Sequence, residues 1–124
     1  MSLTTLRTIQ RMNAKEQERY WIYMLRLANG SYYTGYTIDL HRRVLAHRSG
    51  RGAKLTRSFS PVAVAACWQL HAPKGAAMRI EAWIKGRSRQ AKQALIDQPE
   101  TLGELLRRRG WDEPIEAVVP PPSY

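Results

Sequence analysis

The side chains of this sequence that are best suited to chemistry include an arginine, a histidine and an isolated glutamate. Arg43 and His47 stand four residues apart, so a helix would place both on one face. Glu81 is the only carboxylate between Asp39 and Asp97, which makes it nearly the only ligand there for a single Mg²⁺ or Mn²⁺ ion. Hydrolysis of a phosphodiester needs an activated water, a cation against the phosphate oxygens and help for the leaving oxygen. Groups of these types could meet those needs, with the planar guanidinium of Arg43 against the phosphate.

Two tyrosines add a group that could take the proton of the attacking water. Tyr23 and Tyr33 lie in the segments 20–27 and 31–37, whose aromatic and aliphatic residues are typical of β-strands. Either tyrosine could orient or deprotonate the water with help from His47. A free phenol has a pKa of about 10, so it needs a metal ion and cationic neighbours to act as a base.

The connection between these two strands decides whether the tyrosines can share a site. Asn29-Gly30 is a strong turn signal. A two-residue turn would pair Ala28 with Ser31 and place the tyrosines on opposite faces of the sheet. A three-residue turn with Gly30 in the left-handed conformation pairs Leu27 with Ser31 and brings them to one face. A shared site therefore predicts the three-residue turn.

The remaining elements complete a small α+β pattern. Asp39 suits the N-cap of a helix that runs to about Arg48, and Gly50 suits its end. We expect a loose helix within 1–18, a basic loop at 51–60, a third strand at 62–70, helices at 74–85, 88–96 and 100–109, and a loose tail at 120–124. The prediction is a small three-stranded antiparallel sheet flanked by helices.

Composition indicates a polyanionic partner. The 124 residues carry a formal net charge of +10, well beyond what solubility needs, although charge alone does not separate DNA from RNA or an acidic membrane. No apolar stretch reaches the length of a membrane span, and the N-terminus shows no signal-peptide pattern. We therefore expect no membrane partner. The single cysteine, Cys67, is expected to be a buried strand thiol, and it suits a reducing, cytoplasmic setting. The oligomeric state is left open.

Basic residues follow the proposed site residues in two clusters that could track a phosphate backbone. The alternative for either cluster is an ordinary solvated surface. The candidate nucleic-acid-binding residues are Arg48, Arg51, Lys54 and Arg57 in the first cluster and Lys85, Arg87 and Arg89 in the second.

The ordered set of motifs resembles a known family. Trp21-Ile22-Tyr23 lies in the first strand and Tyr33-Thr34-Gly35 in the second, and Arg43 follows that glycine by eight residues. His47 comes one helical turn later and Glu81 lies in a later helix. With this spacing, the segment 20–96 resembles the GIY-YIG nuclease domain, and most closely its small, single-domain bacterial branch. The basic run 50–57 also resembles that branch.

Some positions depart from the family pattern. Trp21 replaces the glycine of the first motif, and Thr34 replaces an isoleucine of the second. Family members often carry an asparagine after the metal-binding glutamate, and this chain has none there; Gln90 or Gln93 could substitute.

The resemblance implies a fold, an activity and site residues. It implies a metal-dependent endonuclease domain at 19–97, between an N-terminal extension at 1–18 and a C-terminal helix and Pro-rich tail at 98–124. The expected substrate is DNA, single-stranded or branched, in repair, recombination or DNA uptake. The expected catalytic residues are Tyr23, Tyr33, Arg43, His47 and Glu81, with Tyr23 favoured as the base and Glu81 as the ligand of Mg²⁺ or Mn²⁺.

Other interpretations remain open. The chain could be a nucleic-acid-binding module that has lost catalysis, or a structural RNA- or ribosome-associated protein. An isolated carboxylate in a basic surface argues against both, because it would repel phosphate without serving binding. Individually, Tyr23 and Tyr33 could be core residues, Arg43 part of a solvated basic run, His47 an exposed helix residue, and Glu81 merely the partner of Lys85.

Overall fold

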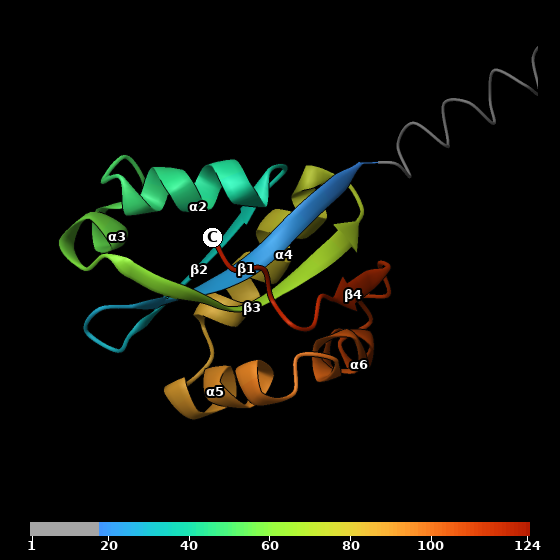
Figure 1. The fold of residues 1–124 in the computed structure, drawn as a ribbon. Helices are drawn as coiled ribbons and strands as arrows, with labels where there is room; N and C mark the ends of the chain where they lie inside the picture. Colours follow the sequence, from blue (N-terminus) through green and yellow to red (C-terminus); the bar gives the residue numbers. More distant parts are fainter. Residues whose placement is uncertain (1–17) are drawn as a thin grey trace, which may run out of the picture.

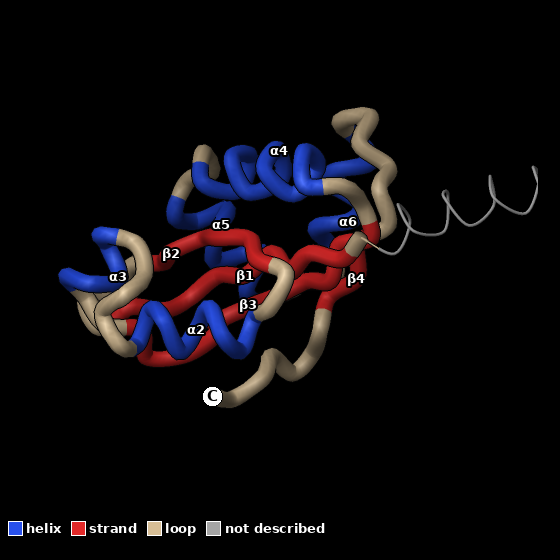
Figure 2. Tube along the Cα trace, turned by 90° about the horizontal axis from the view of Figure 1, so that it is seen from above, coloured by secondary structure: helices blue, strands red, loops and turns tan. Residues whose placement is uncertain are grey.

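The protein folds into three layers, with a sheet between helices on both faces. The computed structural model describes residues 18–124, so the helix predicted in the N-terminal extension lies outside the described residues, Glu18 excepted. An antiparallel sheet of order β2-β1-β3-β4 is built from β1 (Arg19–Leu27), β2 (Tyr32–Thr37), β3 (Pro61–His71) and β4 (Ile115–Ala117). One face carries α2 (Leu40–Arg48), and the other carries α4 (Lys74–Lys85), α5 (Arg89–Asp97) and α6 (Thr101–Arg108) (Figures 1 and 2).

β1 is buried on both faces because its side chains alternate between two cores. Ile22 and Met24 pack with the core under α4, α5 and α6. Tyr23 and Leu25 point to the opposite face, where they join Val44 of α2. A nearly continuous apolar run is what a central strand covered on both sides requires.

The hairpin between β1 and β2 has the predicted three-residue turn. The Leu27 amide donates to the Ser31 carbonyl at 2.9 Å, and Gly30 has a φ of 82°, in the left-handed region that favours glycine. The resulting register places Tyr23 opposite Gly35 and Leu25 opposite Tyr33. Tyr23 and Tyr33 are therefore diagonal neighbours on one face of the sheet.

The start of α2 also follows the prediction. The Asp39 carboxylate accepts a hydrogen bond from the Arg42 amide at 3.1 Å, which satisfies one of the free amides of the first turn. After the last helical residue, Gly50 turns the chain away with a φ of 77°. The cap thus sets the start of α2, and the four-residue spacing places Arg43 and His47 on one face of it.

The structure corrects three expectations. The sheet has four strands, because β4 pairs with residues 68–70 of β3. The predicted loop at 51–60 contains a short helix, α3 (Lys54–Ser58). The C-terminal tail packs back onto the domain, since the Tyr124 ring stacks on His41 with 4.6 Å between centroids. The chain ends on the α2 side of the sheet (Figure 2).

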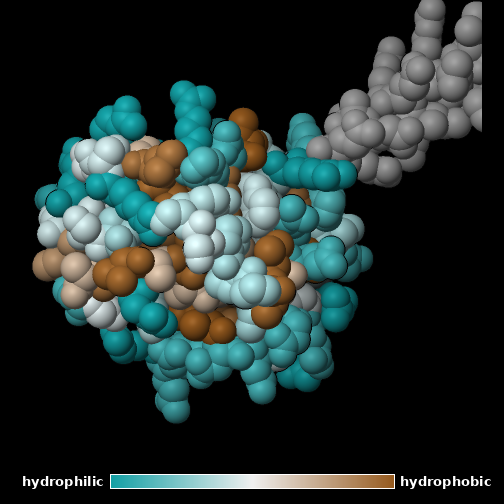
Figure 3. Space-filling model, in the orientation of Figure 1, coloured by the Kyte–Doolittle hydropathy of each residue, from teal (hydrophilic) through white to brown (hydrophobic). Residues whose placement is uncertain are grey.

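Surface and core match the composition in other respects. Hydrophilic side chains cover most of the face seen in Figure 3, with hydrophobic groups in smaller patches between them. Cys67 is buried in β3, as predicted, and burial raises the pKa of its thiol to about 11. Within residues 18–124, every helix is too short or too polar to cross a membrane.

Candidate active site

A pocket of about 450 Å³ brings together residues from four elements beside β2. Tyr23 comes from β1, Tyr33 from β2, Arg43 from α2 and Glu81 from α4. These are four of the five predicted catalytic residues. The whole lining consists of Tyr20, Tyr23, Tyr33, Tyr36, Thr37, Ile38, Arg43, Lys74 and Glu81.

Tyr23 forms a buried part of the pocket wall. Its relative exposure is 0%, and its hydroxyl makes a hydrogen bond of 2.9 Å with Nε2 of His47. The ring lies directly over Gly35, where an added Cβ would be 2.4 Å from the Tyr23 hydroxyl oxygen. Glycine at position 35 is therefore what allows the ring to lie against β2. This contact gives a physical reason for the glycine in the second motif.

His47, the fifth predicted catalytic residue, lies behind Tyr23. It is fully buried, which excludes the alternative that it is an exposed helix residue. Its Nδ1 makes a second hydrogen bond, of 2.8 Å, with the Thr56 hydroxyl on α3. Burial lowers the pKa of His47 to about 4, and the charge of Arg43 contributes to this shift. His47 is thus a neutral imidazole near pH 7.

Burial shifts the pKa of Tyr23 in the opposite sense. Loss of hydration disfavours the phenolate, so the pKa of Tyr23 lies well above its ordinary value. Tyr33 reinforces the increase, whereas Arg43 offsets part of it. In the free protein Tyr23 is therefore a neutral phenol near pH 7, and it is not a preformed phenolate.

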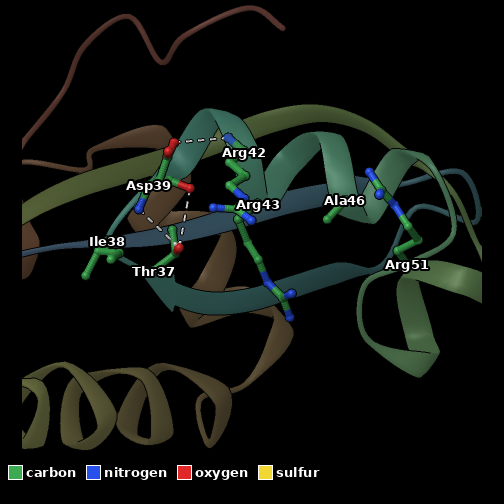
Figure 4. Close-up of a pocket in the computed structure, with 7 residues that line it drawn as sticks. All are labelled: Thr37, Ile38, Asp39, Arg42, Arg43, Ala46 and Arg51. Carbon is green, nitrogen blue, oxygen red and sulfur yellow. Dashed lines mark hydrogen bonds between the residues drawn. The ribbon is translucent and has the colours of Figure 1, made fainter.

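Arg43 extends from α2 across the strands toward β2 (Figure 4). Burial alone would lower the pKa of Arg43, but interaction with the Tyr23 and Tyr33 hydroxyls outweighs it and raises that pKa. The guanidinium also borders a second pocket, of about 480 Å³, which Figure 4 shows. Because the two pockets share Thr37, Ile38 and Arg43, they adjoin along β2 and α2, and together they are called the cleft.

Glu81 faces the cleft from α4 and is paired with a lysine. Its Oε1 lies 2.7 Å from Nζ of Lys85, and the side chains are 16% and 48% exposed, respectively. The simple ion pair considered as an alternative is therefore present, and Glu81 also borders the pocket. Among residues 18–124, no three His, Cys, Asp or Glu side chains gather closely enough to hold a metal ion by themselves. A Mg²⁺ ion held by one carboxylate, waters and phosphate fits this donor set.

Comparison with known proteins identifies the arrangement. A family model described as the GIY-YIG catalytic domain matches residues 19–94, which is more than half of the chain. The chain belongs to the GIY-YIG family. A UPF0213 protein of Halalkalibacterium halodurans is 43% identical over 77 residues, covering 62% of this chain and 81% of the relative. A UPF0213 protein of Streptococcus sanguinis is 42% identical over 82 residues, covering 66% of this chain and 93% of the relative.

A solved structure is similar in sequence as well. The solution NMR structure of a UPF0213 protein from Bacillus halodurans is 41% identical, with a TM-score of 0.43. The match covers 64% of this chain and 84% of that one. The resemblance to the GIY-YIG family inferred from the motifs is thus confirmed by the family match.

The basic residues predicted to bind nucleic acid are only partly brought to the cleft of the GIY-YIG domain. Lys85 lies over the Tyr33 ring, with its Nζ 5.6 Å from the ring centroid, and Arg51 borders the second pocket. Arg89 stacks on Tyr32 and donates to the Gly30 carbonyl at 3.0 Å, close to the hairpin turn. Of these cations, Lys85 contacts the site tyrosine Tyr33, Arg51 borders the neighbouring pocket, and Arg89 lies at the hairpin turn.

Other predicted cations lie elsewhere on the GIY-YIG domain. Arg87 turns onto Trp83, whose carbonyl accepts from it at 3.0 Å. Arg48 borders the pocket formed by the C-terminal tail. Lys54 and Arg57 are exposed on α3. Sequence clustering therefore did not separate the cations that share the cleft from those that do not.

Several cleft residues were not predicted. Tyr20, Tyr36 and Lys74 border the tyrosine pocket, with Tyr20 and Tyr36 packed edge to face at 6.1 Å between ring centroids. The two-residue alternation of β2 puts Tyr36 on the face opposite Tyr33, so face counting alone assigns it to the core.

The contacts of Gln93 do not support the idea that it takes the place of the family asparagine. The Gln93 amide accepts from the Tyr32 hydroxyl at 2.6 Å and donates to Asp97 at 2.9 Å, away from Glu81. Its two polar atoms are thus engaged with α5 and β2 in this structure.

Proposed function

We propose that this protein is a metal-dependent endonuclease that hydrolyses phosphodiester bonds in DNA. A GIY-YIG catalytic domain implies a nuclease and hence a nucleic-acid substrate. The observation that carries the proposal for this chain is the Tyr23–His47 hydrogen bond of 2.9 Å, set in a pocket wall between Arg43 and Glu81. That arrangement offers a proton path, a phosphate-binding cation and a metal-binding carboxylate within one cleft.

In the proposed reaction, Tyr23 relays the proton of the attacking water. The water gives a proton to the Tyr23 oxygen as the Tyr23 proton passes to Nε2 of His47. The water oxygen bonds to phosphorus, the bond from phosphorus to the leaving oxygen breaks, and that oxygen takes a proton from solvent. A relay of this kind needs no free phenolate, which agrees with the raised pKa of Tyr23.

Arg43 would hold the phosphate and adjust the relay. Its guanidinium can donate two parallel hydrogen bonds to phosphate oxygens. The charge of Arg43 is the second cause of the low pKa of His47, after burial. A phosphate paired with Arg43 would offset that charge, so substrate binding would make His47 a stronger base.

Glu81 would hold the Mg²⁺ or Mn²⁺ ion, with waters and substrate phosphate as the other ligands. When bound, the ion supplies charge stabilisation at the phosphate and leaving oxygens. To hold the ion through Oε1, Glu81 would exchange its contact with Lys85 for the ion. Lys85 would then be free to pair with a phosphate oxygen beside Tyr33.

Single-stranded or branched DNA is the proposed substrate form, in repair, recombination or DNA uptake. Tyr20 and Tyr36 support it, because half-exposed aromatic rings at the pocket edge can stack on an unpaired base. Duplex DNA offers no unpaired base to such rings. The preference between DNA and RNA is part of the test below.

The test compares cleavage and binding in one experiment. The purified chain is incubated with labelled single-stranded, duplex and branched DNA and with single-stranded RNA, in Mg²⁺, in Mn²⁺ and in chelator. Glu81→Ala should abolish metal-dependent cutting while binding persists. Glu104→Ala is the matched control, because Glu104 makes the same i, i+4 ion pair, with Arg108 at 2.7 Å, on α6.

The outcomes separate the two main interpretations. Cutting that needs metal and Glu81, but not Glu104, supports the endonuclease. Binding of all substrates without cutting in any metal would replace it with the nucleic-acid-binding module. Equal loss of cutting in both glutamate variants would remove Glu81 from the metal site.

A further inference from the structure

A buried line of hydrogen bonds runs behind the cleft from β1 to α3. The Tyr23 hydroxyl bonds to Nε2 of His47 at 2.9 Å, and Nδ1 of the same ring bonds to Thr56 Oγ1 at 2.8 Å. The Thr56 hydroxyl in turn donates to the Ala53 carbonyl at 2.8 Å. Tyr23, His47 and Thr56 are each no more than 1% exposed. His47 and Thr56 border neither pocket of the cleft, so solvent does not compete for the bond between them.

The last bond of this line sets the direction of the others. A carbonyl oxygen only accepts, so the single hydroxyl proton of Thr56 is used on Ala53. Thr56 then has only lone pairs left for His47, and Nδ1 must carry the ring proton. A neutral imidazole has one N–H, which leaves Nε2 bare. The Tyr23 hydroxyl consequently donates to Nε2.

Packing holds the imidazole in this position. A Cβ on Gly52 would be 2.1 Å from Nδ1 of His47, so the backbone at Gly52 lies against the same edge of the ring that faces Thr56. The Tyr33 ring also packs near the imidazole, with 4.9 Å between ring centroids. The ring has little room to turn and exchange its two nitrogens.

We propose that Thr56 is a positioning residue for cleavage, which fixes His47 as the Nδ1–H tautomer and so keeps Nε2 free to accept the Tyr23 proton. The inference rests on the proposed function for its catalytic consequence, while the tautomer itself follows from the hydrogen bonds alone. In the opposite tautomer, Nε2–H would donate to the Tyr23 oxygen. Tyr23 could then pass no proton to His47, and the relay would stop at the phenol.

Thr56 also has an ordinary local role, which the test must separate from this one. Its bond to Ala53 is the short-range kind that serine and threonine make in helices, and α3 has no side-chain cap at Ala53. Thr101 makes the same bond to the Gln98 carbonyl at 2.8 Å, at the start of α6. Thr101→Val is therefore the matched control, since it removes an equivalent local bond without touching a histidine.

The first measurement reads the tautomer directly. Long-range ¹H–¹⁵N correlation spectra of the labelled full chain at pH 7 distinguish Nδ1–H from Nε2–H rings, and His47→Gln assigns the signal. We expect Nδ1–H for His47 in wild type, in Thr56→Ser and in Thr101→Val. Thr56→Val, which keeps the shape but removes the hydroxyl, should move His47 toward Nε2–H. An Nε2–H ring in wild type would overturn the inference, even if Thr56→Val failed to fold.

The second measurement follows single-turnover DNA cleavage in the same four proteins. Thr56→Val should lower the rate about 10- to 100-fold, the range known for losing the partner that orients a metal-bound histidine. Thr56→Ser should restore it, and Thr101→Val should leave it unchanged. A wild-type rate in Thr56→Val would refute the positioning role. If wild type cuts no substrate, the proposed function fails, and the tautomer spectra alone decide whether Thr56 fixes His47.

Discussion

Replacing Gly35 with alanine tests whether the position of the Tyr23 hydroxyl matters. The added Cβ would lie 2.4 Å from the hydroxyl oxygen and 2.6 Å from Cζ, whereas ordinary contact begins at 3.4 Å. The ring must therefore retreat from β2 by about 1 Å. Tyr23 and Gly35 are directly paired between β1 and β2, so the backbone offers little relief.

Two effects of Gly35→Ala should be measurable. Overpacking of this kind costs about 1–3 kcal/mol of unfolding free energy, which urea denaturation measures. The displacement changes the geometry between the Tyr23 hydroxyl and Nε2 of His47, and a misplacement of about 1 Å can lower catalysis about 100-fold. Single-turnover cleavage under saturating DNA and metal measures that loss while removing any change in affinity.

A control on α4 makes the result interpretable. A Cβ on Gly75 would meet no atom within 4 Å, and the residue lies in the first turn of the helix. Gly75→Ala should keep the wild-type rate and gain up to about 1 kcal/mol of stability from helix propensity. If Gly35→Ala folds stably and still cuts at the wild-type rate, the geometry of Tyr23 is irrelevant to cleavage and the relay is wrong.

Three further outcomes follow from the same site. Burial lowers the pKa of His47 from 6.5 to about 4, so the unfolded chain takes up the proton first on acidification. As the pH falls from 6.5 to 4, the free energy of unfolding should therefore decrease by roughly 3 kcal/mol. Urea titrations at pH 7 and pH 4 should show a smaller decrease in His47→Gln than in wild type. Lys85→Met removes the ion pair that competes with Mn²⁺ for Glu81. Calorimetry should show Mn²⁺ binding up to about fivefold tighter, which corresponds to ~1 kcal/mol for a partly exposed ion pair. Weaker Mn²⁺ binding would contradict competition between Lys85 and the ion for Glu81. Gly52→Ala should disturb His47 and reduce cleavage without weakening DNA binding in gel-shift assays; a normal rate would mean that the ring tolerates displacement.

Local signals in the sequence predicted much of the fold. Asp39 and Ser88 each cap a helix with a side-chain acceptor, as their residue types indicate. The requirement that Tyr23 and Tyr33 share a face predicts the hairpin register that the structure has at Gly30. Such features depend on the chemistry of a few adjacent residues, so a single sequence can reveal them.

What the sequence did not predict depends on contacts between distant segments. β4 has only three residues and lies between prolines, so its pairing partner on β3 decides that it is a strand. α3 begins at Lys54 with no capping side chain at Ala53, and its sequence pattern is typical of a basic loop. The contact of Thr56 with His47 joins α3 to α2, and no spacing rule within either segment predicts it.

The C-terminal segment reduces the length of sheet edge that another protein chain could pair with. The family match ends at residue 94, whereas β4 covers the outer side of β3 at residues 68–70, and the Val118 amide continues the pairing to the Cys67 carbonyl at 3.0 Å. Without β4, this end of β3 would present unpaired backbone amides and carbonyls to any other extended chain. The chain from Pro114 to Val118 therefore covers the β3 edge at residues 67–71, and β2 forms the opposite edge of the sheet, beside the cleft.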